Sequence, residues 1–214
     1  MRDGGQLRKR STRNGARNDP DKPLRADARR NREALVDAAS AVFAASGVDA
    51  PIQEIADRAG VGVGTVYRRF PKRSDLIVAV FRREVDACAE AARSLAADHA
   101  PYEALSRWIE RYLDLIVTKR GLAAAWHSGE PAYESLPGYF EERLVASLQG
   151  LLKAAGSDMR ADISAAELLR AVALLCSPAS SGDFAQTRRM VALLVNGLRV
   201  SVGEANGAGR RHPE

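Results

Sequence analysis

Apolar residues recur at three- and four-residue spacing along most of the chain, a periodicity that predicts amphipathic α-helices. Leu35, Ala38, Val42 and Phe43 lie on one such stripe, in a helix that we expect to begin at Asp27 and to end at Gly47. We therefore predict an all-α fold of about nine helices, at residues 27–47, 52–59, 63–70, 72–95, 101–116, 120–127, 140–156, 164–176 and 190–202.

The stretch from Ile52 to Phe70 has the pattern of two short helices joined by a tight turn. Gly60 ends the first helix, because glycine adopts the left-handed conformation that a helix C-terminus favours. Gly62 can cap the second helix, which buries Val66 and Phe70. With the helix before them, these two form a three-helix unit that contains a helix-turn-helix.

The second helix of this pair presents a polar face outward. A hydroxyl, a phenol and guanidinium groups on one exposed face suit phosphate oxygens and base edges in a DNA major groove. The alternative interpretation is a solvated helical hairpin with incidental charge. We expect the DNA contacts to come from Val63, Gly64, Thr65, Tyr67, Arg68, Arg69, Lys72 and Arg73.

Positive charge is concentrated at the N-terminal end of the sequence. Residues 1–73 carry sixteen Lys and Arg against nine Asp and Glu, a net charge of +7, whereas residues 74–214 carry −2. This asymmetry indicates a nucleic-acid-binding end joined to a nearly neutral body. Residues 1–26 lack periodicity and predict a disordered basic arm, or alternatively an inert solubilising tail, and residues 205–214 predict a flexible tail.

The segment AGVGVGTVYRRFPKRSDLI resembles the DNA-binding domain of the TetR/AcrR family of bacterial transcriptional regulators. The family motif has the form AGVSxGTLYxxFxxKxxLL, and the resemblance covers about residues 27–80. Gly62 stands where Ser is common, and Arg73 stands where Lys is common. The residues that match the motif directly are Ala59, Gly60, Val61, Gly64, Thr65, Tyr67, Phe70 and Leu76.

The resemblance implies a DNA-binding domain at residues 27–73 and a ligand-binding and dimerisation domain at residues 74–204. It implies that Lys72 and Arg73 face the DNA backbone. The last two helices are apolar over more than one face, which favours a homodimer with Leu194 and Leu198 in its interface. The alternative is that both residues face the core of the monomer. Helices that surround the ligand pocket in this family would contribute Trp108, Tyr112, Trp126 and His127, although core packing is a strong alternative for each.

The sequence offers no constellation for catalysis. Its three histidines have no zinc-binding spacing, and Cys88 and Cys176 lie in apolar helical stretches as expected of core thiols. We therefore expect no enzyme activity, no metal and no cofactor. No apolar run approaches the roughly 20 residues of a membrane span, so we expect a cytoplasmic protein without a membrane partner.

These observations predict a ligand-responsive repressor that an unknown small-molecule effector releases from a palindromic double-stranded DNA operator. The competing hypothesis is a small-molecule-binding or enzymatic helical protein whose helix-turn-helix is only structural.

Overall fold

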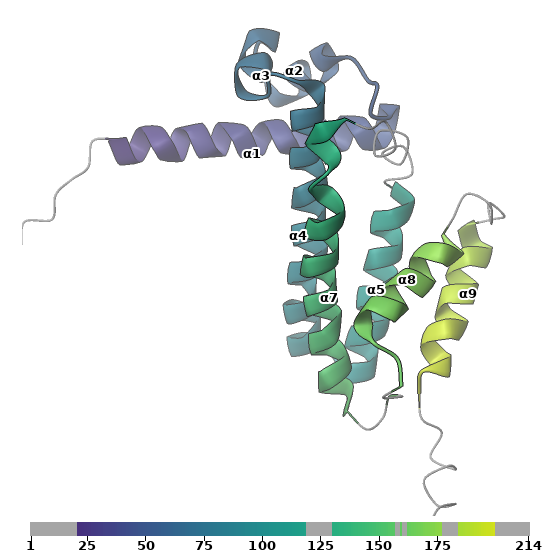
Figure 1. The fold of residues 1–214 in the computed structure, drawn as a ribbon. Coiled ribbons are helices and arrows are strands. Elements are labelled where there is room, and N and C mark those ends of the chain that lie inside the picture. Colours follow the sequence, from purple (N-terminus) through teal and green to yellow (C-terminus); the bar gives the residue numbers. More distant parts are fainter. Residues whose placement is uncertain (1–20, 119–129, 157–158, 160–161, 177–183, 200–214) are drawn as a thin grey trace, which may run out of the picture.

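The computed structural model describes residues 21–118, 130–156, 159, 162–176 and 184–199 (Figure 1). This part of the chain folds into eight α-helices and one short 3-10 helix, which confirms the all-α prediction. It contains no β-strand, only an isolated antiparallel β-bridge between Met159 and Arg199. The helix expected at residues 120–127 and the tail at residues 205–214 lie outside the described residues.

The elements follow one another along the chain as α1 (Asp21–Ser46), α2 (Ile52–Ala59), α3 (Val63–Arg69), α4 (Arg73–Asp98), α5 (Pro101–Thr118), η1 (Pro131–Tyr133), α7 (Leu136–Ala155), α8 (Ala165–Leu175) and α9 (Phe184–Gly197). None of the helices that the structure describes combines the length and apolarity needed to cross a bilayer.

The body is a bundle in which α4, α5 and α7 run side by side (Figure 1). Helices α8 and α9 pack against α5 and against each other on the opposite side from α4. Helix α1 crosses α4 near the N-terminal end of α4. Helix α2 packs against α1, and α3 packs against α2. The long α4 therefore belongs to both parts of the molecule and carries the helix-turn-helix at one end.

Helix α1 begins at Asp21, six residues before the predicted start at Asp27, so residues 21–26 of the predicted disordered arm are helical. Residues 1–20 of that arm lie outside the described residues. Pro23 lies in the first turn, where a missing N–H removes no helical hydrogen bond. The early turns project past the body and need no apolar stripe, so they carry no periodic signal (Figure 1). Exposed pairs support the projecting part instead, with Arg29 3.6 Å from Glu33.

The core of the body is built from the predicted stripes of α4 and α5. The indole N–H of Trp108 donates to the backbone oxygen of Cys88 at 2.8 Å, and the indole ring stacks on Tyr112 with centroids 5.9 Å apart. Cys88 and Cys176 are both buried free thiols, as predicted. Burial raises the pKa of the Cys88 thiol to about 12, although the charge of Arg111 acts in the opposite direction.

Candidate nucleic-acid interface

The turn between α2 and α3 forms as the glycines predict. Gly60 has φ 68° and ψ 33°, a left-handed conformation that glycine adopts without steric strain. The N–H of Val61 then donates to the oxygen of Ala56 at 3.0 Å, which closes the end of α2. Gly62 is the extended N-cap residue of α3, and its oxygen accepts from the N–H of Thr65 at 2.8 Å. The sequence therefore sets the helix-turn-helix geometry.

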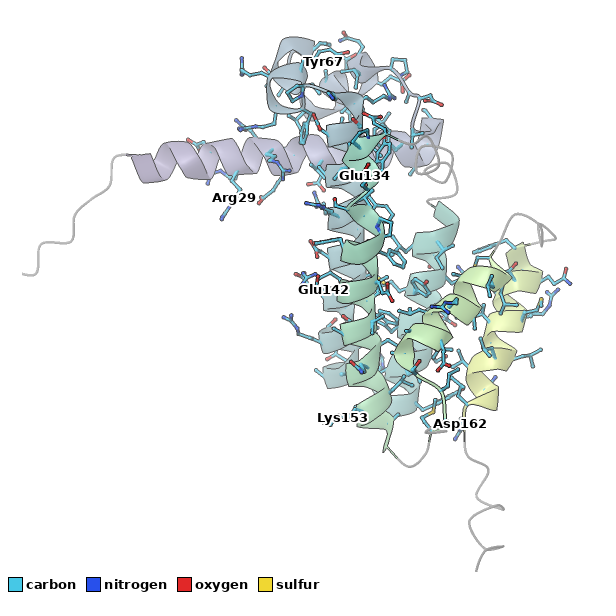
Figure 2. The ribbon with its side chains drawn as sticks, viewed as in Figure 1. Arg29, Tyr67, Glu134, Glu142, Lys153 and Asp162 are labelled. Atoms are coloured by element: carbon cyan, nitrogen blue, oxygen red, sulfur yellow. The ribbon has the colours of Figure 1, made fainter. Side chains whose placement is uncertain are left out.

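Helix α3 buries one face and exposes the other. Val66 and Phe70 are buried, as predicted, and hold α3 against the neighbouring helices. Tyr67 is 50% exposed, and it lies on the end of the molecule remote from α8 and α9 (Figure 2). Arg68 and Arg69 are also exposed. A phenol and two guanidinium groups thus meet solvent on the face that we predicted to contact DNA.

Two further features of this face concern Arg68 and Gly64. The Nη2 of Arg68 lies 3.4 Å from the Oγ1 of Thr65, which directs the guanidinium along the exposed surface. A β-carbon added at Gly64 would meet no heavy atom within 4 Å. Packing within the chain therefore does not require glycine at position 64, whereas contact with an external backbone or phosphate would.

Lys72 is the N-cap residue of α4 and is exposed, as a phosphate contact requires. Its backbone N–H donates to the Oδ2 of Asp75 at 3.0 Å. The Asp75 carboxylate lies in the first turn of α4, where a negative charge is favourable against the helix dipole. The helix start is thus stabilised by Asp75, and the Lys72 ammonium group is available to an external anion.

Arg73 differs from the prediction that it faces the DNA backbone. Its guanidinium is directed into the domain, where Nε donates to the oxygen of Val48 at 2.8 Å and Nη2 donates to the oxygens of Val48 and Ala50. The side chain is half-buried, and its Cζ lies 5.8 Å from the centroid of the Phe43 ring. The carbonyl oxygens of the turn between α1 and α2 therefore take the place of the expected phosphate.

The C-terminal body contains a mainly apolar cavity of about 300 Å³, open to solvent, between α5, α7 and α8. Tyr112 is among the residues that line it, together with Phe140, Val145 and Leu169, but the Tyr112 side chain is 1% exposed and packs in the core. Glu141 and Arg170 are its charged residues. The side chain of Phe140 lies between the core and the cavity. Helical periodicity predicts that it faces inward but does not distinguish a core residue from a cavity-lining one.

Trp108 is a core residue, because its indole is fully buried and its N–H is satisfied by Cys88. For Trp108, core packing is therefore the correct alternative to a place in the ligand pocket. Burial raises the pKa of Tyr112, and its hydroxyl donates to the oxygen of Leu169 at 3.2 Å. Trp126 and His127 lie outside the described residues.

The interface assignment of α9 needs correction at Leu198, which is only 5% exposed in the single chain and belongs to its core. Leu194 is half-buried and packs against the core. The apolar side chains that point away from the chain are instead Leu174, Met190 and Leu193, which are 67%, 43% and 70% exposed. These residues lie on the neighbouring helices α8 and α9.

An exposed polar recognition helix at one end of an all-helical body is the plan of a helix-turn-helix transcriptional regulator. Residues 35–80 match the family model "Bacterial regulatory proteins, tetR family", and residues 100–200 match "Transcriptional regulator SbtR-like, C-terminal domain". The chain belongs to the tetR family of bacterial regulatory proteins.

Among the residues that the structure describes, no group of three His, Cys, Asp or Glu could hold a metal ion.

Solved structures of similar length support this assignment. A TetR transcriptional regulator of Streptomyces coelicolor is 36% identical, with a TM-score of 0.65, over 80% of this chain and 99% of that one. A TetR transcription regulatory protein of Mycobacterium vanbaalenii is 37% identical, with a TM-score of 0.66, over 83% of this chain and 100% of that one.

An HTH-type transcriptional regulator of Staphylococcus aureus (strain USA300) is 29% identical over 108 residues. That match spans 50% of this chain and 58% of the relative, so it covers little more than half of that regulator.

Proposed function

We propose that this protein is a dimeric repressor that binds a palindromic operator and is released from it by a small apolar effector. The observation that carries the proposal is the face of α3, where Tyr67 and Arg68 are exposed while Val66 and Phe70 anchor the helix. Arginine recognises guanine by two parallel hydrogen bonds in the major groove. The exposed Lys72 adds a phosphate contact beside it.

Dimerisation through α8 and α9 would present two copies of α3 to the same side of a DNA duplex. The exposed Leu174, Met190 and Leu193 supply the apolar surface for this contact. Two recognition helices about 34–36 Å apart reach successive major grooves. A change in this separation weakens binding to both half-sites at once, which is the simplest way for an effector to release the operator.

The effector would bind in the cavity that Tyr112 and Phe140 line. The ring of Phe140 lies 6.1 Å from that of Phe81 on α4 and 6.0 Å from that of Tyr112 on α5. Displacement of Phe140 by a ligand would therefore be transmitted to α4, which carries the helix-turn-helix. A coupling free energy of about 1–3 kcal/mol is typical of such linked sites.

The experiment that tests this function selects operators from a random duplex library and then measures affinity as the salt concentration rises. A regulator of this kind should bind one palindromic sequence at least about 10³-fold tighter than random DNA. Its affinity should fall steeply with salt, because each phosphate contact releases counterions. A protein that retains no duplex through selection at low salt would instead support the hypothesis of a structural helix-turn-helix.

Arg68→Ala should weaken operator binding without unfolding the protein, since the side chain is exposed. If Arg68 reads a guanine, its loss should cost about 1–3 kcal/mol for each half-site and relax specificity at one base pair. Competition binding against singly substituted operators measures both effects. Wild-type affinity with unchanged base preference would show that Arg68 does not read DNA.

Gly64→Ala should have opposite effects on stability and on DNA binding. Alanine in a helix is about 0.5–1 kcal/mol more favourable than glycine, and the added methyl group has open space, so the melting temperature should stay level or rise. Operator affinity should fall, because the methyl group would separate α3 from the DNA. A stabilised variant with wild-type affinity would show that position 64 does not approach DNA closely.

A further inference from the structure

The Arg73 side chain joins three separate parts of the DNA-binding domain. Arg73 is the first residue of α4, its donors reach the backbone oxygens of Val48 and Ala50, and its guanidinium lies over the ring of Phe43 near the end of α1. These hydrogen bonds span 23 to 25 residues of sequence. One side chain therefore links the end of α1, the turn before α2 and the start of α4.

The backbone oxygens of Val48 and Ala50, in the turn between α1 and α2, accept these hydrogen bonds from Arg73. Gly47 has φ +80° and ends α1, and the N–H of Ala50 donates back to the Gly47 oxygen at 3.2 Å. Ala50 is buried and Val48 is half-buried, so their oxygens have restricted access to water. A buried carbonyl without a donor is costly, and a charged donor satisfies it more strongly than a neutral one.

We propose that Arg73 is a positioning residue that fixes the helix-turn-helix on α4 and does not itself contact phosphate. The inference rests on the proposed DNA-binding function. Helix α3 is connected to α2 on one side and to α4 on the other, so a clamp between the turn before α2 and the start of α4 closes the segment that contains α2 and α3. Loss of this clamp misplaces the exposed face of α3 relative to the base edges.

Arginine is suited to this role in a way that lysine is not. Its planar guanidinium carries five N–H donors, so it can donate to two carbonyl oxygens and still stack on an aromatic face. A lysine ammonium keeps the positive charge but has no planar face and no fixed fork of donors. Substitution by lysine therefore separates the charge of Arg73 from its geometry.

The clamp also lies where the C-terminal body meets the helix-turn-helix. The 3-10 helix η1 packs against α4, and its Tyr133 is buried. Burial raises the pKa of Tyr133, Glu130 raises it further, and the nearby positive charge of Arg73 lowers it.

The test compares Arg73→Lys and Arg73→Gln with Lys72→Gln, a matched control at the neighbouring exposed position. Affinity for the selected operator and for a random duplex is measured across salt concentrations, at a temperature where circular dichroism shows each variant folded. Hydrogen exchange of residues 44–52 reports the turn directly, without DNA.

Arg73→Lys should bind the operator about tenfold more weakly than wild type, an effect as large as the removal of one base-reading side chain, and its preference over random DNA should fall about tenfold. Its salt slope should stay unchanged because the charge remains, and residues 44–52 should exchange faster. Lys72→Gln should weaken binding to both DNAs alike, reduce the salt slope by about 0.9 for each phosphate that Lys72 neutralises, and leave exchange unchanged.

Wild-type operator affinity in Arg73→Lys would overturn the proposal, as would an Arg73→Gln variant that behaves like Lys72→Gln. If either Arg73 variant fails to fold, Phe43→Leu is the second test, because it removes the stacked ring and keeps an apolar side chain. It should reproduce the reduced preference and the faster exchange in weaker form, about threefold, and wild-type behaviour would overturn the proposal. Should wild type bind no DNA, the proposed function fails, while hydrogen exchange still tests the clamp.

Discussion

Leu193→Glu should convert the dimer into a folded monomer that no longer binds the operator. Leu193 is 70% exposed in the single chain, so a carboxylate there meets solvent in the monomer and leaves its core intact. In a two-fold interface through α8 and α9, the substitution would bury two unpaired carboxylates. Each uncompensated buried charge costs about 3–5 kcal/mol, so the two together cost at least about 6 kcal/mol and should make the dimer at least about 10⁴-fold weaker.

Light scattering and circular dichroism together measure this result, with Leu193→Ala as the control that removes the side chain without adding a charge. The alanine variant should weaken the dimer much less than the glutamate variant does. A Leu193→Glu protein that stays dimeric and binds the operator normally would place the interface elsewhere.

Leu198→Glu should destabilise the C-terminal body, although Leu198 is only five residues from Leu193 on the chain. Leu198 is 5% exposed in the single chain, so its carboxylate would be buried in the monomer itself. A penalty of about 3–5 kcal/mol lowers the melting temperature of a chain of this size by about 6–20 °C. Thermal melts followed by circular dichroism measure the loss.

The comparison of the two glutamate variants tests the orientation of α9. Leu193→Glu should keep the wild-type helical content and a cooperative thermal transition, whereas Leu198→Glu should melt well below Leu193→Glu. A Leu198→Glu variant that is monomeric and keeps the wild-type helical content and melting temperature would restore Leu198 to the interface.

The helix-turn-helix could be predicted from the sequence because local signals determine it. Gly60 ends α2 in the left-handed conformation, Gly62 starts α3, and the apolar Val66 and Phe70 fix which face is buried. The capping box of α8 is equally local: Ser164 and Glu167 exchange hydrogen bonds as their three-residue spacing predicts. Short-range chemistry of this kind requires no knowledge of the tertiary fold.

The errors concern interactions between distant segments. The role of Arg73 depends on carbonyl groups 23 to 25 residues away, which no local pattern reveals. The apolar residues of α9 cover more than one face, and periodicity alone does not determine which face packs on its own chain. Only the packing of α9 against α5 and α8 distinguishes the buried Leu198 from the exposed Leu193.

Because Cys88 and Cys176 are buried, the rate at which they react with a thiol reagent reports the opening of the protein. They are the two cysteines of the chain, both are buried, and a Cys88 pKa of about 12 leaves almost no thiolate at neutral pH. A thiol-specific dye can therefore modify Cys88 only when the body opens, so the rate of labelling measures how often the body opens. An effector that binds the cavity near Tyr112 should slow the dye reaction, which would allow candidate molecules to be ranked before any operator is identified.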